Sequence, residues 1–356
     1  MIQEIRKSNI RRLLLRYVRD HQLAAGDRLP GQNELRRLFQ CGATTLTAAI
    51  QELCQEGVLL SREKVGVFVV DVRATEQFSR RIGIIMGELV GSPFQAFLNV
   101  YIEQFLSRYD CRAIWLHQRE GASAKIYNGL EDIVNLRQSV ETSELDGLIS
   151  MVFCDAELEN YLNQNGIKLI YISNYAPQPN HICLDYATMT ERSVRQLAAQ
   201  GFRRIEMLMS VQLDWLQRSF IEAMRKNGLP ADARHFHCRS FSQIDDGEYE
   251  KWLNGVFAEW VSRTEAERPD ALVVPDDMLA IRLQLFLSAH PEWQPTVIAL
   301  YNDNMRLPML PMPCGYWRFR IDRYAEFIVR NFMKMLREEK KELPFLAYLP
   351  EFVPPA

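Results

Sequence analysis

Three threonines near the N-terminus have the chemistry to contact DNA bases. Thr44, Thr45 and Thr47 lie close together on one expected helix. Their hydroxyl groups can donate to or accept from several bases, and their methyl groups can pack against the methyl group of thymine. A local role is the alternative, because Thr44 can cap its helix and the others can pack within it. We expect Thr44 to cap the helix and contact phosphate, and Thr45 and Thr47 to contact bases.

Basic side chains near the threonines could neutralise DNA phosphates. Arg62 and Lys64 lie in the charged turn SREKVG at residues 61–66, where Gly66 allows a tight bend. Arg36 and Arg37 precede the threonines on another expected helix. Taken singly, each cation is equally well explained as solvated surface. Residues 1–71 hold eleven Lys and Arg against eight Asp and Glu, a charge of +3, which leaves −6 in the remainder. The excess permits contact with nucleic acid at the N-terminus without proving it.

The elements that must position these side chains are three helices and a two-stranded ribbon. Apolar residues at three-to-four spacing predict a basic amphipathic helix over residues 2–22 and a short one over 34–39. A third helix over 44–56 ends at Gly57, and apolar runs at 58–60 and 67–70 predict two strands. This order is the plan of a winged helix-turn-helix. The alternative is a small helical domain in which the ribbon only completes the core.

The rest of the chain has the rhythm of an α/β fold. Seven short apolar runs predict strands, at 82–86, 113–116, 147–152, 168–172, 205–209, 271–274 and 296–300. Helical stretches alternate with them near 94–107, 126–138, 156–165, 187–200, 214–227, 248–262 and 278–288. Continuously apolar strands are typical of parallel sheets covered by helices. Seven units exceed one sheet, so we expect two lobes. The expected division is a head over residues 1–71, a polar linker over 72–80 and a two-lobed body over 81–356.

Length and composition agree with this division. A chain of 356 residues, 47% of them hydrophobic, can bury more than one core. We expect a cytoplasmic protein, because no apolar run is long enough to cross a bilayer and the N-terminus lacks the apolar core of a signal peptide. The seven cysteines are scattered and never spaced as CxxC, so we expect reduced thiols.

An enzyme is the main alternative from another class. The glycine patterns of dinucleotide and phosphate loops are absent, as is the GxSxG motif of hydrolases. We expect His235 and His237, in the stretch HFHC at 235–238, to share one face of a strand without further ligands for a metal. The paired carboxylates at 245–246 and 276–277 are adjacent and should point apart. We therefore expect no metal, no cofactor and no catalytic residue. A solute-binding protein or a sugar-modifying enzyme of similar two-lobed fold remains the other interpretation.

The head resembles the GntR family of bacterial regulators. The resemblance rests on GDRLP (26–30), ELRRLF (34–39), TTLTAAIQELCQEGVL (44–59) and VGVFV (65–69), in the order and spacing of that family. It implies a winged helix-turn-helix that binds duplex DNA. Several positions differ, because Gly42-Ala43, Asn33, Thr47 and Lys64 stand where the family usually carries Ser-Arg, two arginines and a glycine. The resemblance thus implies the fold, and Asn33 as a further contact, but a different set of base contacts.

The body resembles the ligand-sensing domain of LacI-type regulators, built like a periplasmic sugar-binding protein. The resemblance covers about residues 81–352 and rests on RIGIIM (81–86), ICLDY (182–186), LAAQGFRRI (197–205), SFIEAMRKNGLP (219–230) and RPDALVVPDDMLA (268–280). A GntR-like head on a LacI-like body resembles the arabinose-repressor subgroup. This combination implies a cytoplasmic repressor that responds to a sugar or sugar derivative.

The second resemblance also nominates residues for the effector site. Ligands of such domains bind at the carboxyl ends of strands, where aromatic faces stack on sugar rings and charged groups pair with hydroxyls. The candidates are Ser92, Phe94, Asn174, Trp215, Arg218, Asp276, Tyr301, Trp317 and Arg318. Asp276 aligns with the aspartate that holds sugar hydroxyls, although it could instead cap a helix. Leu216 stands at the position of a frequent arginine, so Arg218 must replace it or the ligand lacks the matching group.

The expected partners are an operator in double-stranded DNA, a small-molecule effector and a second copy of the chain. One head reads too few base pairs to be specific in a genome, and a homodimer on a two-fold operator doubles the contacts. We expect the body to form the dimer, and we expect no membrane partner.

Overall fold

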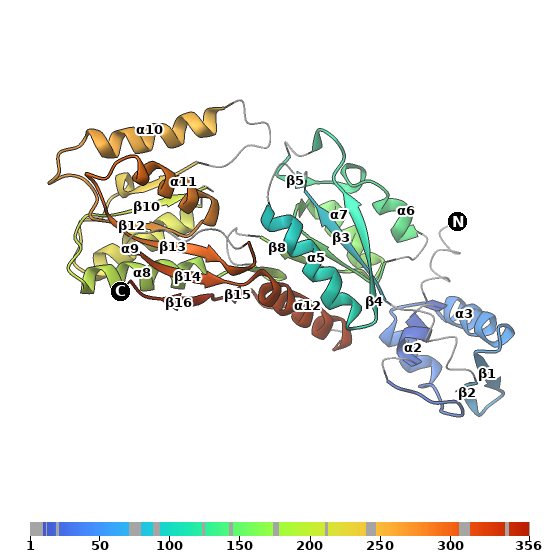
Figure 1. Cartoon of the computed structure of the whole chain (residues 1–356). Coiled ribbons are helices and arrows are strands. Elements are labelled where there is room, and N and C mark those ends of the chain that lie inside the picture. Colours follow the sequence, from blue (N-terminus) through green and yellow to red (C-terminus); the bar gives the residue numbers. More distant parts are fainter. Residues whose placement is uncertain are drawn as a thin grey trace. The chain divides into compact units, whose positions relative to one another are not determined.

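The computed structural model describes most of the chain (Figure 1). The described residues are 10–18 except 12, 21–70, 80–87, 93–122, 125–141, 145–173, 178–210, 213–239, 247–305, 314–338 and 342–355. The chain divides into two compact units, neither of them continuous in sequence. Unit 1 comprises Met1–Leu89, Glu103–Ile172 and Val329–Glu342, and unit 2 comprises Val90–Ile102, Ser173–Ile328 and Leu343–Ala356. The expected linker lies almost entirely outside the described residues.

The head, within unit 1, has the expected order of helices and strands. Residues 10–18 are helical where they are described, and helices α2 (Gln32–Leu38) and α3 (Ala43–Gln55) follow. Strands β1 (Leu59–Arg62) and β2 (Gly66–Val69) then form an antiparallel ribbon. One apolar cluster joins the helices to the ribbon and includes Leu14, Leu35, Leu46, Leu53 and Val67. The predicted winged helix-turn-helix is confirmed.

The remainder of unit 1 is built on a parallel sheet. Strands β3 (Arg80–Met86), β4 (Cys111–His117), β6 (Gly147–Ser150) and β8 (Lys168–Ile172) lie in the order β8-β6-β3-β4. Helices α6 (Leu136–Glu141) and α7 (Ala156–Gln164) pack on this sheet through one apolar cluster. Helices α5 (Pro93–Ser107) and α12 (Ile321–Arg337) each run from one unit into the other. Close packing requires Gly147, because an added Cβ would lie 2.6 Å from the ring of Phe332.

The helix that was expected over residues 126–138 of unit 1 begins only at Leu136. Residues 126–138 contain the short strand β5 (Tyr127–Asn128), the 3-10 turn η2 (Leu130–Asp132) and only the first residues of α6. Strand β5 pairs in parallel with β7 (Phe153–Cys154). The buried side chain of Asn128 accepts a hydrogen bond from Gln118 (2.7 Å) and donates one to the carbonyl of Phe153 (3.2 Å). These tertiary contacts override the local helical pattern.

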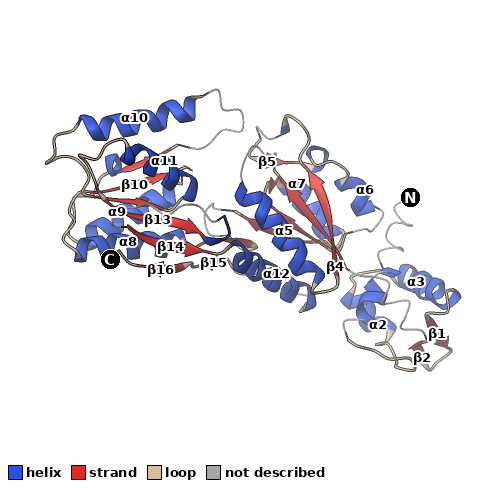
Figure 2. Ribbon diagram, viewed as in Figure 1, coloured by secondary structure: helices blue, strands red, loops and turns tan. Residues whose placement is uncertain are grey.

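Unit 2 contains a second sheet, with the order β11-β10-β12-β13-β14-β16 (Figure 2). Its strands are β10 (Ile205–Met209), β11 (Phe236–Cys238), β12 (Ala271–Val274), β13 (Thr296–Asn302), β14 (Cys314–Phe319) and β16 (Glu351–Val353). The first five are parallel and β16 is antiparallel to β14. A further parallel pair joins β9 (His181–Leu184) to β15 (Leu346–Tyr348). The predicted α/β architecture with parallel sheets is confirmed.

Helices cover the sheet of unit 2 because its strands are apolar on both faces. Helices α10 (Glu248–Ser262) and α11 (Asp277–Ser288) pack on strands β10, β12 and β13 through one apolar cluster. Helices α8 (Tyr186–Ala199) and α9 (Asp214–Lys226) contact each other, and α8 also contacts β12. Two 3-10 turns complete the unit, η3 (Ala233–His235) and η4 (Asp303–Met305). All four residues of β12 are buried, which requires cover on both faces.

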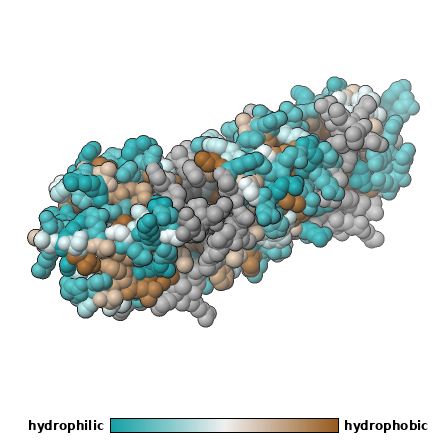
Figure 3. Space-filling model, turned by 90° about the horizontal axis from the view of Figure 1, so that it is seen from above, coloured by the Kyte–Doolittle hydropathy of each residue, from teal (hydrophilic) through white to brown (hydrophobic). Residues whose placement is uncertain are grey.

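Because the apolar side chains are buried in these cores, mostly polar side chains remain at the surface. The face in Figure 3 is mostly hydrophilic, with small hydrophobic patches between the polar residues. None of the described helices is long and apolar enough to cross a membrane. The seven cysteines are free thiols, as expected.

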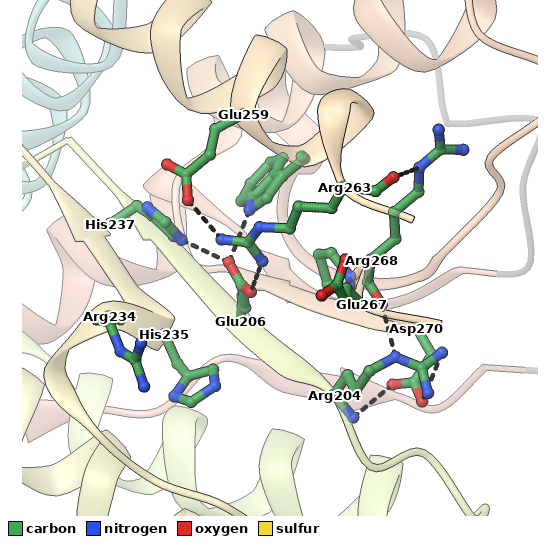
Figure 4. A network of polar contacts seen from close by, with 12 residues as sticks. Arg204, Glu206, Arg234, His235, His237, Glu259, Arg263, Glu267, Arg268 and Asp270 are labelled. Carbon is green, nitrogen blue, oxygen red and sulfur yellow. Dashed lines mark hydrogen bonds and ion pairs between the residues drawn. The ribbon is translucent and has the colours of Figure 1, made fainter. Parts of the chain in front are cut away.

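A buried carboxylate ties α10 to the sheet of unit 2 (Figure 4). Glu206 on β10 is 3% exposed; its carboxylate lies 2.5 Å from Nε2 of His237 and accepts hydrogen bonds from Trp260 (2.7 Å) and Arg263. Burial alone would raise the pKa of Glu206, but these donors lower it overall. The expectation of two histidines on one strand is wrong, because His235 ends η3 and only His237 lies on β11. His237 is thus a structural partner of Glu206, and the described residues contain no cluster of metal ligands.

Replacement of Glu206 should destabilise the protein. Glu206→Gln places an amide among three donors, and breaking a buried ion pair from one side typically costs about 3–5 kcal/mol. Because the folded pKa is lowered, the stabilisation is present above the unfolded pKa of about 4.3 and is lost as the pH falls through the folded value. Denaturant unfolding at pH 7 and pH 4 measures both effects. Glu222→Gln, which removes an exposed partner of Lys226, is the control and should change little. A Glu206→Gln protein as stable as wild type at pH 7 would contradict this.

Candidate nucleic-acid interface and effector site

Helix α3 presents a polar face because its apolar face is held in the core of the head. Leu46, Ala49, Ile50 and Leu53 are buried. Thr44 is exposed on the other side, and Thr45 and Thr47 are half-buried. Of the three candidate threonines, Thr44 is thus the most accessible to a ligand of the head.

The expected cap of α3 is wrong. Gly42 is the N-cap, with extended backbone, and α3 begins at Ala43. Thr44 therefore already lies in the first helical turn, where its side chain is not needed as a cap. Since glycine has no side chain, no cap hydrogen bond is made at this end of the helix. The hydroxyl of Thr44 is left to contact other groups.

The cations of α2 and of the wing are free of acidic partners. Arg36 and Arg37 are exposed in the last turn of α2, and Asn33 is exposed in its first turn. Arg62 and Lys64 are exposed at the end of β1 and in the turn. None of these four cations forms an ion pair with any carboxylate in the described part of the chain. Elsewhere in the head, Arg11 is paired with Glu56 at 2.7 Å.

The backbone of the wing turn is sharply bent. Lys64 has a φ of +58° and Gly66 one of +139°, and the latter value belongs to the region that glycine adopts without strain. Arg62 and Gly66 face each other across the ribbon. The guanidinium of Arg62 lies 5.2 Å from the ring centroid of Phe68. The three candidate DNA-contacting residues of the wing, Arg62, Lys64 and Gly66, therefore lie on one hairpin.

In unit 2, Asp276 joins the ends of two strands. It follows β12 and caps α11, since its Oδ1 accepts a hydrogen bond from the backbone N–H of Leu279 (2.9 Å). Its Oδ2 accepts a hydrogen bond from the hydroxyl of Ser210, which follows β10. The cap considered as an alternative is therefore present. Each carboxylate oxygen has a second lone pair, so the cap does not prevent Asp276 from binding a ligand.

Two further residues that follow or end the same strands, Asp277 and Asn302, belong to the same cluster. Burial and the charge of Asp276 raise the pKa of Asp277 to about 6. The side-chain amide of Asn302, 0% exposed at the end of β13, lies 3.4 Å from Oδ2 of Asp277. Asn304 then links Asn302 to the hydroxyl of Tyr101, 3.3 Å away. A perturbed pKa in a polar cluster at the carboxyl ends of strands is typical of a functional site. The position at the carboxyl end of a strand, which nominates Asp276 and Tyr301 from the sequence, nominates these two residues as well.

Helix α9 carries two of the candidates and the substituted position. Trp215 is half-buried, and its indole Nε1 is buried without a hydrogen-bond partner among the described residues. Leu216 is buried, so the position of the frequent arginine is part of the core. Arg218 is exposed and forms no ion pair in the described part of unit 2. Nothing in the structure brings Arg218 to the Asp276 cluster.

The aromatic candidates have different environments. Trp317 is 1% exposed, donates a hydrogen bond to Ser193 (2.9 Å) and packs against Phe352. Trp317 is therefore a core residue and not an exposed group of the effector site. Phe94 is half-buried against Phe319, with ring centroids 5.8 Å apart.

The last described candidates lie on β13 and β14. Tyr301 packs against Tyr316, with ring centroids 5.6 Å apart. Arg318 lies between Asp303 (3.5 Å) and Glu351 (3.6 Å). Ser92 and Asn174 lie outside the described residues. Of the candidates, the structure thus joins Asp276 to a polar cluster, and Tyr301 and Arg318 each contact Tyr316.

Two parts of the chain each match a known protein family. Residues 6–69 match the family described as "Bacterial regulatory proteins, gntR family". Residues 194–342 match the family described as "Periplasmic binding protein-like domain".

Solved structures of regulators share the fold. A regulatory protein of the LacI family from Chloroflexus aggregans has a TM-score of 0.59 at 14% identity, over 78% of this chain and 98% of that one. The complex of the transcriptional regulator CelR with cellobiose has a TM-score of 0.57 at 15% identity, over 88% and 90%. The lac repressor dimer bound to operator and an anti-inducer has 0.58 at 14% identity, over 80% and 97%. The chain therefore joins a helix-turn-helix domain of the gntR family of bacterial regulatory proteins to a periplasmic binding protein-like domain with the fold of LacI-family regulators.

Proposed function

We propose that this protein is a transcriptional repressor whose affinity for its operator is controlled by a small polar effector, such as a sugar. Residues 1–71 bind duplex DNA, residues 72–80 link them to the body, and residues 81–356 bind the effector. The observation that carries the proposal is that a gntR-type domain exposes the polar face of α3 together with cations of α2 and the wing that pair with none of the described carboxylates. As a regulator of transcription, the protein acts in the cytoplasm and is not an enzyme.

Electrostatics support the role of the head. Lys and Arg that neutralise phosphates release condensed counterions from DNA, which drives binding at low salt. A cation already paired with a carboxylate contributes less, because it must give up that partner. None of the described carboxylates pairs with Arg36, Arg37, Arg62 or Lys64, so these cations have no such partner to give up. Thr45 and Thr47 supply the contacts to bases and Thr44 a contact to phosphate, with Asn33 and Gly66 at the edges of the interface.

The chemistry of the Asp276 cluster supports a polar, uncharged ligand. Carboxylate, amide and hydroxyl groups from Ser210, Asp276, Asp277 and Asn302 converge within unit 2. Such groups bind the hydroxyls of sugars. The complex of CelR with cellobiose, which shares the fold, agrees with this class of ligand. A ligand regulates DNA binding only through its different affinity for two arrangements of the protein.

Two exposed apolar residues on one stripe of α11 support a homodimer. Met278 and Leu285 are 47% and 65% exposed and lie two turns apart on one face of the helix, on either side of Arg282, whose charge is paired with Glu250. Phe97 and Val100 on α5 are also exposed. We propose that a second copy of the chain covers the stripe, as two heads are needed to read a two-fold operator. The lac repressor, which shares the fold, is a dimer on its operator.

Removal of a wing cation should weaken binding to every duplex. For Arg62→Ala or Lys64→Ala we expect the slope of log affinity against log salt to fall by about one unit per lost phosphate contact. Fluorescence anisotropy with labelled duplexes at several salt concentrations measures this. Arg234→Ala removes an exposed arginine of unit 2 and serves as the control. Duplex binding that persists in a chain lacking residues 1–71 would refute the role of the head.

Replacement of Asp276 should weaken binding of the effector and leave DNA binding without effector unchanged. A panel of mono- and disaccharides, screened by thermal shift, supplies the ligand. Loss of a hydrogen bond to a charged group typically weakens binding about ten- to hundredfold, which we expect for Asp276→Ala. Asp276→Asn keeps a capping side chain and separates loss of the cap from loss of the charge. Calorimetry showing that both variants bind the sugar as tightly as wild type would remove Asp276 from the site.

A charge in the apolar stripe should prevent dimer formation. Leu285→Asp places a carboxylate where the second copy would bury an apolar side chain, and we expect a monomer at concentrations at which wild type is dimeric. Sedimentation velocity measures the state of each protein. Gln200→Glu, an exposed charge at the end of α8, is the control. A monomeric wild type, or a dimeric Leu285→Asp variant, would contradict this interface.

A further inference from the structure

The wing has a third strand-like segment that the helix-turn-helix plan does not require. Residues 26–29 lie antiparallel to β2. The backbone N–H of Gly26 donates to the carbonyl of Val69 (2.8 Å), that of Val69 to Asp27 (2.9 Å) and that of Leu29 to Val67 (2.8 Å). Arg28 and Phe68 form the pair directly opposite each other. A residue far from the hairpin in sequence thus becomes part of the wing.

Alternation of side chains places Arg28 on the outer face of this small sheet. Leu29, Val67 and Val69 are buried in the core of the head. Their neighbours along each strand must point the other way. Arg28 and Phe68 therefore share the outer face, as do Leu60, which pairs with Phe68, and Arg62, which pairs with Gly66. Arg28, Leu60 and Arg62 are exposed, as this requires.

The two arginines on the outer face flank the ribbon. The guanidinium of Arg62 lies over the ring of Phe68, at 5.2 Å. That of Arg28 lies over Gly66, since a Cβ added there would be 2.6 Å from its Nε and 3.2 Å from its Cζ. The bare backbone of Gly66 therefore leaves the space in which the Arg28 guanidinium sits. Lys64 follows in the turn, so three cations lie along one edge of the head.

The charge of Arg28 has no partner among the residues that the structure describes. Arg28 forms no hydrogen bond or ion pair through its guanidinium in the described part of the chain. Its neighbour Asp27 is engaged elsewhere, since its carboxylate accepts the backbone N–H of Ala24 at 2.7 Å. A planar guanidinium matches the oxygens of a phosphate in a bidentate contact. A free guanidinium that is held in place by its backbone pairing has the chemistry to bind one.

We infer that Arg28 is a DNA-contacting residue, which binds a phosphate of the same duplex as Arg62 and Lys64. The inference rests on the proposed function of the head. It also assigns Gly66 a second role, because any side chain there would displace the Arg28 guanidinium. The alternative is that Arg28 only packs against the ribbon and stabilises it.

The test is the salt dependence of binding by Arg28 variants of the full chain. The probe is the duplex of highest affinity that wild type selects from a random-sequence library. We expect Arg28→Gln to lower affinity about tenfold and the salt slope by about one unit per head. Arg28→Lys, which keeps the charge, should keep the slope and lose only part of the affinity. Arg11→Gln removes the same charge from a paired site and should leave the slope unchanged.

The outcomes distinguish failure of the proposed function from failure of the proposed role of Arg28. If wild type selects no duplex, the proposed function fails and Arg28 has no DNA to contact. If wild type binds but Arg28→Gln has the same affinity and slope, the role of Arg28 is refuted and the proposed function stands. A lower melting temperature with an unchanged slope shows that Arg28 only stabilises the wing. An equal loss in Arg11→Gln shows a general effect of charge, which also refutes the inference.

Discussion

The structure depends on the need to bury short strands that are apolar on both faces. Such strands must be covered by helices on both sides, and helices that connect parallel strands bring all the carboxyl ends to one edge of the sheet. In unit 2 this edge carries Ser210, Asp276 and Asn302, which follow or end β10, β12 and β13. Their convergence is a consequence of how the core is covered. The polar cluster needs no special local sequence to form.

A buried and a half-buried carboxylate in unit 2 show how strongly and weakly compensated charge differ. Glu206 has three donors and a lowered pKa, so it is held as a charged structural link. Asp277 has a long contact with Asn302 and a neighbouring negative charge, and its pKa is raised to about 6. The first arrangement stabilises the fold. The second leaves a group whose hydrogen bonds a ligand could complete, and groups of this kind gather at functional sites.

The cations of the head also differ in whether they have a carboxylate partner among the described residues. Arg11 has a carboxylate partner, whereas Arg28, Arg62 and Lys64 have none in the described residues. Burial of one face of α3 and one face of the wing sheet forces the opposite faces outward. The unpaired charges and the threonine hydroxyls are thereby displayed by the packing of the core. DNA is the partner that would satisfy both.

Local pattern was enough to predict most elements, because apolar periodicity reports directly on which face of a helix or strand is buried. Strands such as β8, β10 and β12 and helix α10 have the bounds that were expected, and the winged helix-turn-helix followed from three apolar periods and a ribbon. Helix α12 (Ile321–Arg337) was missed although its own apolar period is clear. The other failures depend on contacts between distant segments. The buried amide of Asn128 turned an expected helix into a short strand, and Trp317 entered the core through Ser193. Gly42 replaced Thr44 as the N-cap because the helix already begins at Ala43. Asp277 and Arg28 acquired their surroundings from β13 and β2. The sequence by itself thus determined which face of most helices and strands is buried. Only the tertiary structure decided which polar groups are paired, because hydrogen-bond partners come from segments that no local period relates.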